Sequence, residues 1–239
     1  MNQPETLLRI EKLMHSVLTK VYDWESFKDD FQNMLRVAES VYQPELEYSP
    51  LIQAYFDLML ANSWFDENDV FYQYQLFKSF QRRLAEQQQD FLAEFEAKNK
   101  RNQRSLFEYF ASLLQQHRKL LLVRVDLSYK FDHVPTIKQF DQDIKRLTRR
   151  IQDKDTIFKG QGGYVYRLEQ GGKSKGFHCH LLVIYNGSKH WSDGYLGQCI
   201  GELWQEQITS GDGQFFNCNQ KAHKQKYQQS KQLGIGMIE

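Results

Sequence analysis

The apolar residues of the first 116 positions recur at steps of three and four, the period of a helix with one buried face. The first such stripe is Leu7, Ile10, Met14, Val17 and Val21. Later stripes predict helices over about residues 25–41, 51–62, 70–98 and 103–117. Pro44 and Pro50 lie between expected helices, where they break no helical hydrogen bond. This part of the chain is therefore predicted to be helical, with its aromatic residues in the core.

At Arg118 the pattern changes to apolar, β-branched runs with the length of strands. Strands are predicted over residues 121–128, 163–170, 177–185 and 214–218. Helical periodicity predicts helices over 136–152, with Thr136 as the N-cap, and over 192–208. The resulting order, β-α-β-β-α-β, is typical of an antiparallel-rich sheet with helices on one face. The predicted fold is therefore α+β, with an all-helical region at 1–117 and a sheet domain at 118–239.

The composition is that of a soluble globular chain, with 41% hydrophobic and 26% charged residues and a mean hydropathy of −0.67. No apolar run approaches the ~18 residues of a membrane span, and the polar, acidic N-terminus does not resemble a signal peptide. The three cysteines, an odd number without a C-x-x-C pair, argue against disulfides and zinc fingers. We therefore expect a cytoplasmic protein with no membrane partner.

Charge divides the chain into an acidic and a basic part. Residues 1–116 contain 12 Lys and Arg against 18 Asp and Glu, whereas residues 117–239 contain 19 against 12. A basic region predicts a polyanionic partner, although charges that only solvate two surfaces would give the same balance. Lysines flank an expected turn near 171–176 and gather with Tyr227 after residue 220, a mixture that suits single-stranded DNA. The candidate DNA-binding residues are Lys173, Lys175, Lys221, Lys224 and Lys226.

The sharpest chemical feature is His178-Cys179-His180 in the third expected strand. Side chains two residues apart share a face of a strand, so both imidazoles point the same way, about 7 Å apart at their roots. If the hairpin turn is centred between residues 173 and 174, Glu169 is opposite His178 on this face. Two imidazoles and a carboxylate suit Mg²⁺ or Mn²⁺, and Zn²⁺ is compatible with them. The alternative is that both histidines are core residues with ordinary hydrogen-bond partners, and a bulge at the glycines would move Glu169 to the other face.

Several segments of the basic region resemble a known family. A strand, a helix and a hairpin that ends in His-hydrophobe-His resemble the HUH endonuclease superfamily, the replication initiators and relaxases of rolling-circle elements. The glutamate some nine residues before the first histidine is similar to the viral initiators of that superfamily. Residues 118–239 more specifically resemble the inovirus-type replication proteins, a prophage-encoded family that contains the YagK/YfjJ C-terminal domain. The segments that carry this likeness are 176–188 (GFHCHLLVIYNGS), 200–204 (IGELW), 216–219 (FNCN) and 234–238 (GIGMI).

The resemblance implies an enzyme that nicks single-stranded DNA. In this superfamily a tyrosine hydroxyl attacks a phosphodiester and becomes linked to the 5′ phosphate, with a histidine-bound divalent cation beside the phosphate. By this likeness His178 and His180 are metal ligands and Glu169 is the third. Asp126 in the first strand is a further candidate ligand, or else a residue at the end of that strand. The family's Y-x-x-x-K pattern matches the candidate nucleophile and its cationic neighbour, Tyr227 and Lys231.

The resemblance leaves alternatives open. In the family the chain continues past the Gly-Ile-Gly-Met-Ile segment into a further Tyr-Leu-x-Lys helix, whereas this sequence stops at Glu239. Either Tyr227 serves as the nucleophile or the nucleophile is lost by truncation. In the second case the protein is a non-catalytic DNA-binding relative with a regulatory role. A third alternative is a protein-interaction module of a mobile element, in which the helical region binds another protein and the sheet domain is a scaffold.

Overall fold

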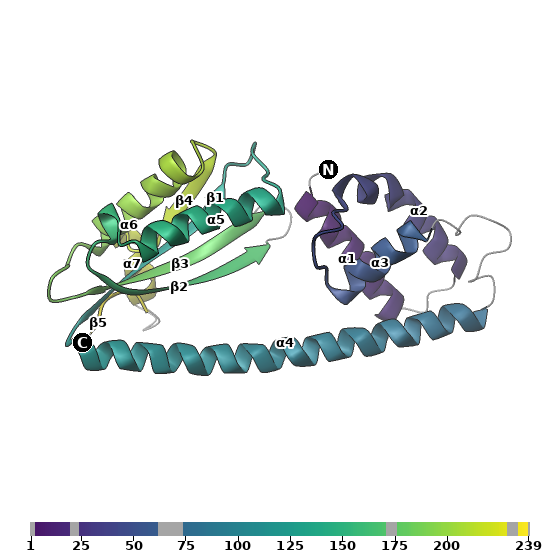
Figure 1. Cartoon of the computed structure of the whole chain (residues 1–239), viewed down its shortest axis with the longest axis horizontal. Helices are drawn as coiled ribbons and strands as arrows, with labels where there is room; N and C mark the ends of the chain where they lie inside the picture. Colours follow the sequence, from purple (N-terminus) through teal and green to yellow (C-terminus); the bar gives the residue numbers. More distant parts are fainter. Residues whose placement is uncertain (1–2, 20–23, 62–73, 171–175, 229–233, 239) are drawn as a thin grey trace. The chain divides into compact units, whose positions relative to one another are not determined.

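The computed structural model describes residues 3–19, 24–61, 74–170, 176–228 and 234–238 of the chain (Figure 1). The chain divides into two compact units, Met1–Arg104 and Ser105–Glu239. The division falls inside the long helix α4 (Tyr74–Gln116), so the first part of α4 belongs to the helical unit and its end to the sheet unit. The domain boundary predicted at residue 117 lies just after the end of this helix.

In the helical unit, three helices pack with the first part of α4 around an aromatic core. These helices are α1 (Gln3–Thr19), α2 (Trp24–Val41) and α3 (Pro50–Leu60). Phe27, Tyr55, Phe56 and Phe77 are at most 1% exposed, as expected for core residues. The expectation is wrong for Phe91, Phe95 and Phe107 of α4, which are 39%, 55% and 76% exposed. The hydroxyl of Tyr55 donates a hydrogen bond of 3.0 Å to the carbonyl of Phe31. Because each helix turns one apolar stripe to the core, the three- and four-residue spacing predicted them correctly.

The predicted break between residues 98 and 103 is wrong, because α4 continues through it as one helix of 43 residues. The sequence of this stretch is Lys-Asn-Lys-Arg-Asn-Gln and contains no apolar residue. The absence of an apolar stripe there is the reason that a loop is predicted. None of these residues is Pro or Gly, so their backbone propensities do not end the helix. Neither α4 nor any other helix among the described residues has the apolar length needed to cross a membrane. Residues 20–21, 62 and 70–73 of the predicted helices lie outside the described part of the chain.

The sheet unit has the predicted α+β character, and its elements as far as the fourth strand follow the predicted order. The short helix and the fifth strand that come after them were not predicted. Its strands are β1 (Leu120–Tyr129), β2 (Gln161–Gln170), β3 (Phe177–Asn186), β4 (Gly213–Asn217) and β5 (Gly236–Ile238). Its helices after α4 are α5 (Ile137–Gln152), a 3₁₀ turn (Thr156–Phe158), α6 (Asp193–Glu202) with a π-helical continuation (Leu203–Ile208), and α7 (Lys221–Gln228). The strands pair antiparallel in the order β2-β3-β1-β4, and β5 pairs with the start of β1.

One face of the sheet is covered by α5 and α6, as Figure 1 shows. The side chains between this face and the helices form the main core. Val125 of β1, Leu181 of β3 and Trp204 after α6 are at most 1% exposed in this core. The indole N–H of Trp204 donates a hydrogen bond of 2.8 Å to the carbonyl of Ser128, which fixes the π-helical segment against β1. The side chain of Thr136 accepts a hydrogen bond from the backbone N–H of Gln139, so the predicted N-cap of α5 is confirmed.

The opposite face of the sheet is divided into an apolar half and a polar half. The buried side chains of the apolar half are Leu113 near the end of α4, Leu120, Leu122 and Ile184. The polar half carries Arg124, Asp126, His178, His180 and, from β2, Glu169. Because side chains alternate along a strand, β1 and β3 supply the core on one side and this divided face on the other. This division places a group of titratable residues next to an apolar, helix-covered surface.

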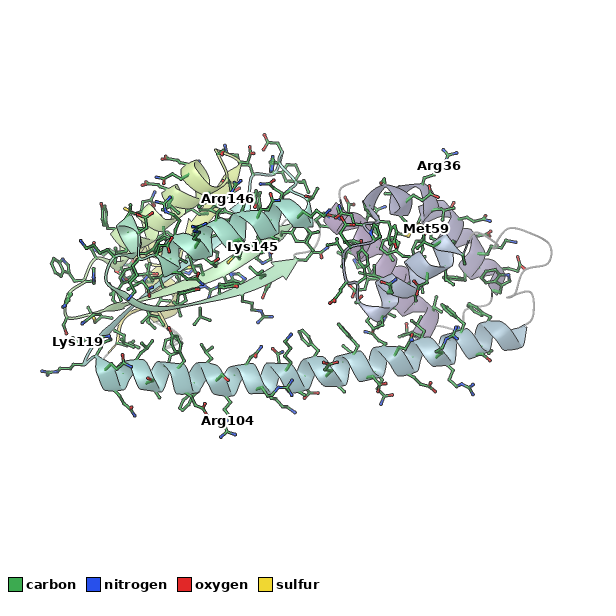
Figure 2. The ribbon with its side chains drawn as sticks, in the orientation of Figure 1. Arg36, Met59, Arg104, Lys119, Lys145 and Arg146 are labelled. Atoms are coloured by element: carbon green, nitrogen blue, oxygen red, sulfur yellow. The ribbon has the colours of Figure 1, made fainter. Side chains whose placement is uncertain are left out.

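The outer face of α5 carries paired charges. Lys145 and Arg146, both labelled on α5 in Figure 2, contact Asp141 at 2.6 Å and Asp143 at 3.3 Å. Arg149 and Arg150 form ion pairs with Asp153 and Asp155, respectively. Each of the four cations therefore has an acidic partner, and α5 is not a uniformly positive surface.

Candidate metal centre

The hairpin register predicted from the sequence is confirmed. Glu169 of β2 is directly opposite His178 of β3, and Arg167 is opposite His180. The irregularity in this strand pair lies at its other end, between Gln161 and Gly163, and not at the hairpin turn. Glu169, His178 and His180 therefore share one face of the sheet, as expected from alternation along the two strands.

These three residues, called the metal-ligand cluster below, bring their side-chain atoms together. One ligand atom from each lies within 4.8 Å of the other two. Nε2 of His178 and Nε2 of His180 lie 3.3 and 3.4 Å from the same oxygen, Oε2 of Glu169. The two imidazole rings are nearly perpendicular, at 86°, with centroids 5.1 Å apart. Three donor atoms therefore point toward one common space.

The other nitrogen of each imidazole has a partner of its own. Nδ1 of His180 lies 2.7 Å from Oδ1 of Asp126, and Nδ1 of His178 lies 3.4 Å from the carbonyl of Gly176. Both of these partners are acceptors, although Nδ1 of His180 also lies 3.3 Å from Nη2 of Arg124, which is a donor. Because the contact with the carboxylate of Asp126 is the shorter one, it favours the tautomer with the proton on Nδ1 and a lone pair on Nε2. Metal-binding histidines commonly have such a partner, which fixes the orientation of the ring.

Asp126 supports His180 rather than joining the metal-ligand cluster. It lies inside β1, opposite His180 and Phe216, so the alternative that it ends the strand is wrong. Arg124 donates to both of its oxygens, from Nε at 3.0 Å and from Nη2 at 3.3 Å. Burial raises the pKa of Asp126, but the hydrogen bonds from His180 and Arg124 outweigh it, and the pKa lies below its usual value. The carboxylate is therefore ionised at neutral pH.

Glu169 is likewise held in its ionised form. Arg167 Nε lies 2.8 Å from Oε1 of Glu169, which leaves Oε2 facing the two histidines. Partial burial raises the pKa of Glu169, whereas the charge of Arg167 and the contact with His180 lower it, and the resulting pKa lies below the usual value. A carboxylate in this state is the form that coordinates a cation.

The metal-ligand cluster can hold a metal ion. Two imidazole nitrogens and one carboxylate oxygen are ligands that Mn²⁺, Zn²⁺ and related divalent cations accept, and three protein ligands leave coordination positions for substrate or water. His178 is 9% exposed as a residue, while the side chains of His180 and Glu169 are 28% and 35% exposed. The cluster is thus anchored in the sheet on one side and open to a ligand on the other.

The structure brings only some of the predicted residues to this centre. In α7 the ammonium of Lys224 forms an ion pair with Asp193 at 2.7 Å, whereas Lys221 and Lys226 are exposed. The backbone of Tyr227 belongs to α7, but its side chain lies outside the described residues. Also outside the described residues are Lys173, Lys175 and Lys231.

Three side chains near the centre were missed from the sequence. Arg124 and Arg167 could have been found, because each lies two residues from a carboxylate on the same strand face. Phe216 of β4 is opposite Asp126 and 47% exposed, with its ring 4.9 Å from that of His223 in α7. No local pattern signals Phe216, because its place beside Asp126 depends on how β4 pairs with β1.

Comparison of the chain with protein-family models, with curated proteins and with solved structures finds no match. The chemistry of the centre therefore has to follow from its own residues.

Proposed function

We propose that residues 105–239 bind single-stranded DNA and nick it, using a tyrosine nucleophile beside a divalent cation held by Glu169, His178 and His180. The observation that carries the proposal is the convergence of both Nε2 atoms on one oxygen of Glu169, with both Nδ1 atoms engaged elsewhere. The likeness of this strand and hairpin pattern to the HUH endonuclease superfamily and its inovirus-type replication proteins supports the same reading.

A cation is needed because a tyrosine, with a usual pKa of about 10, is a poor nucleophile toward an unassisted phosphodiester. Mg²⁺ or Mn²⁺ bound by these residues would supply positive charge that polarises the scissile phosphate. Asp126 and the carbonyl of Gly176 hold the two imidazoles in orientation for that role. Arg124 and Arg167 keep the two carboxylates ionised.

Tyr227 is the proposed nucleophile. It follows His223 by four residues in α7, a spacing that puts two positions on one side of a helix, and His223 contacts Phe216 next to Asp126. The tyrosine oxygen would bond to phosphorus as the bond to the 3′ oxygen breaks, giving a 5′-phosphotyrosine and a free 3′-OH. The tyrosine releases one proton and the 3′ oxygen takes up one, so the step balances. Lys231, four residues further along the sequence, would offset phosphate charge.

The charge of the sheet unit supports DNA as the substrate. The basic surplus of residues 117–239 and the exposed Lys221 and Lys226 provide cations for backbone phosphates. Exposed Phe216 provides an aromatic ring near the centre on which a base can stack.

The test is a covalent adduct. The full chain is incubated with a pool of labelled single-stranded oligonucleotides and Mn²⁺, and adducts are resolved on denaturing gels. We expect an adduct that disappears without Mn²⁺ and in Tyr227→Phe. An adduct that persists in Tyr227→Phe would exclude this nucleophile. Metal-dependent DNA binding without any adduct would favour a non-catalytic, regulatory relative, and no DNA binding at all would favour a protein-interaction module.

Metal binding is tested separately by calorimetry with Mn²⁺. We expect one binding site in the wild type and none in His180→Ala. The control is His15→Ala, which removes an exposed histidine of α1. Equal binding by the wild type and His180→Ala would show that the site is misplaced.

A further inference from the structure

A pocket of about 530 Å³ opens beside the metal-ligand cluster on the same face of the sheet. Glu169 and His180 of the cluster belong to its lining, together with Arg124 and Arg167. Much of the remaining lining is apolar, from the end of α4, from β2 and β3, and from the segment before β5: Leu106, Phe110, Val165, Leu182 and Ile235. The pocket therefore joins titratable and cationic groups to an apolar wall.

The end of α4, which supplies Leu106 and Phe110, is fixed against the sheet. Leu113 is 5% exposed and packs into the apolar half of this face. Gly163 of β2 leaves room for Tyr109, because a Cβ at this position would collide with the hydroxyl of Tyr109. The wall is thus a packed part of the sheet unit.

The charge of the pocket depends on the cation. Arg124 forms an ion pair with Asp126 at 3.0 Å, and Arg167 forms one with Glu169 at 2.8 Å. Within each pair the positive and the negative charge cancel. A divalent cation in the cluster adds two positive charges to this balanced set. The loaded site would then attract an anionic group, next to a surface that suits a flat apolar ring.

A nucleotide combines these two properties. The volume lies within the range of about 300–1,000 Å³ that small-molecule sites usually have. We infer that the pocket holds one nucleotide of the single-stranded DNA next to the phosphate at the cluster, with its base against Leu106, Phe110 and Leu182. This inference rests on the proposed function and adds to it that α4 selects one position of the DNA. The end of α4, which belongs to the sheet unit, thereby becomes a determinant of substrate recognition.

The experiment is an abasic scan. A single-stranded oligonucleotide is first selected from a random pool by the Mn²⁺-loaded Tyr227→Phe chain, so that cleavage does not interfere. Copies with one abasic site at each position in turn are then compared by fluorescence anisotropy. Because stacking and burial of a base stabilise a complex appreciably, we expect about a tenfold loss of affinity at one position near the cluster.

Leu106→Trp fills the pocket and gives the assignment its specificity. We expect Leu106→Trp to lower the affinity for the intact oligonucleotide about tenfold. We also expect that, in this variant, the abasic site at that one position no longer reduces the affinity. The matched control is Leu114→Trp, on the same helix and 42% exposed against 37% for Leu106, but outside the pocket lining. If Leu106→Trp changes the melting curve, Leu106→Ser removes apolar wall without adding bulk and is expected to reduce the same penalty.

The outcomes separate this inference from the proposed function. A position-specific penalty that Leu106→Trp removes and Leu114→Trp keeps supports the pocket. Metal-dependent DNA binding with no such penalty, or with a penalty that both variants keep, would overturn the pocket and leave the proposed function standing. Absence of any metal-dependent binding to single-stranded DNA would overturn both.

Discussion

Asp126 and His180 are directly opposite each other in the β1–β3 pair, and Oδ1 of Asp126 lies 2.7 Å from Nδ1 of His180. A carboxylate that accepts a hydrogen bond from Nδ1 of an imidazole fixes the orientation of the ring and makes Nε2 a better metal ligand. This contact links the first strand of the sheet unit to the hairpin that carries the metal-ligand cluster.

Asp126→Ala is therefore expected to weaken Mn²⁺ binding by about 10–100-fold, although Asp126 is not a proposed ligand. Asp126→Asn, which keeps an acceptor but loses the charge, should fall between Asp126→Ala and the wild type. Calorimetry measures both. The control is Asp141→Ala, which removes a carboxylate paired with Lys145 on α5. Unchanged affinity in Asp126→Ala would mean that His180 needs no such support.

Gly201→Ala is expected to destabilise the sheet unit by ~1–3 kcal/mol. A Cβ at Gly201 in α6 would collide with the ring of Phe215 in β4, and this overpacking outweighs the better helix propensity of alanine. Gly194→Ala, in the first turn of the same helix, is the control, because its Cβ would meet the carbonyl of Asn219 at an ordinary 3.5 Å. Urea denaturation followed by circular dichroism compares the two. Similar stability for both variants would contradict the close approach of α6 and β4.

Three buried tyrosines predict a loss of stability in alkali. Burial raises the pKa of Tyr55, Tyr129 and Tyr185, and Asp143 raises that of Tyr129 further through a hydrogen bond of 2.8 Å. Above about pH 10 the unfolded chain loses these protons while the folded chain keeps them. The stabilising contribution of these tyrosines should therefore be fully present below about pH 10. Above that pH the free energy of unfolding should fall by ~1.4 kcal/mol per pH unit for each such tyrosine.

Denaturation curves at several pH values from about 9 to 11 test this expectation. Tyr185→Phe should reduce the slope by the contribution of one tyrosine, while Tyr166→Phe, at a 43% exposed position, should leave it unchanged. Equal slopes for the wild type and Tyr185→Phe would show that Tyr185 ionises alike in both states.

Binding to single-stranded DNA is expected to weaken with salt, since phosphate contacts release counterions. Replacing the exposed Lys221 and Lys226 by alanine should lower the slope of log K against log salt by ~0.7 for each lost contact. The same change is expected for Lys173→Ala with Lys175→Ala. Lys145→Ala is the control, because this ammonium pairs with Asp141 at 2.6 Å on α5, which covers the face of the sheet opposite to the metal-ligand cluster. Salt-independent binding by the wild type would remove the DNA proposal.

The local patterns of the sequence determined the elements and part of the site. Periodicity located α1, α2, α3 and α5, as well as the order of the first four strands, because burial of one face imposes its period on the residues. The β2–β3 register was also accessible, since a short hairpin brings its two strands together through one local turn. Glu169, His178 and His180 could be assigned to one face for that reason.

Tertiary structure decided the surroundings of that cluster. Asp126 reaches His180, and Phe216 reaches Asp126, through strand pairs separated by 54 and 90 positions of sequence, whose register no short turn fixes. The single helix α4, predicted as two, brings Leu106 and Phe110 to the pocket, because its course depends on packing at its end rather than on the polar stretch at 98–103. The turn of a hairpin determines which residues of its two strands are neighbours. Which residues of distant segments lie next to that hairpin is determined by the burial of apolar surface between those segments.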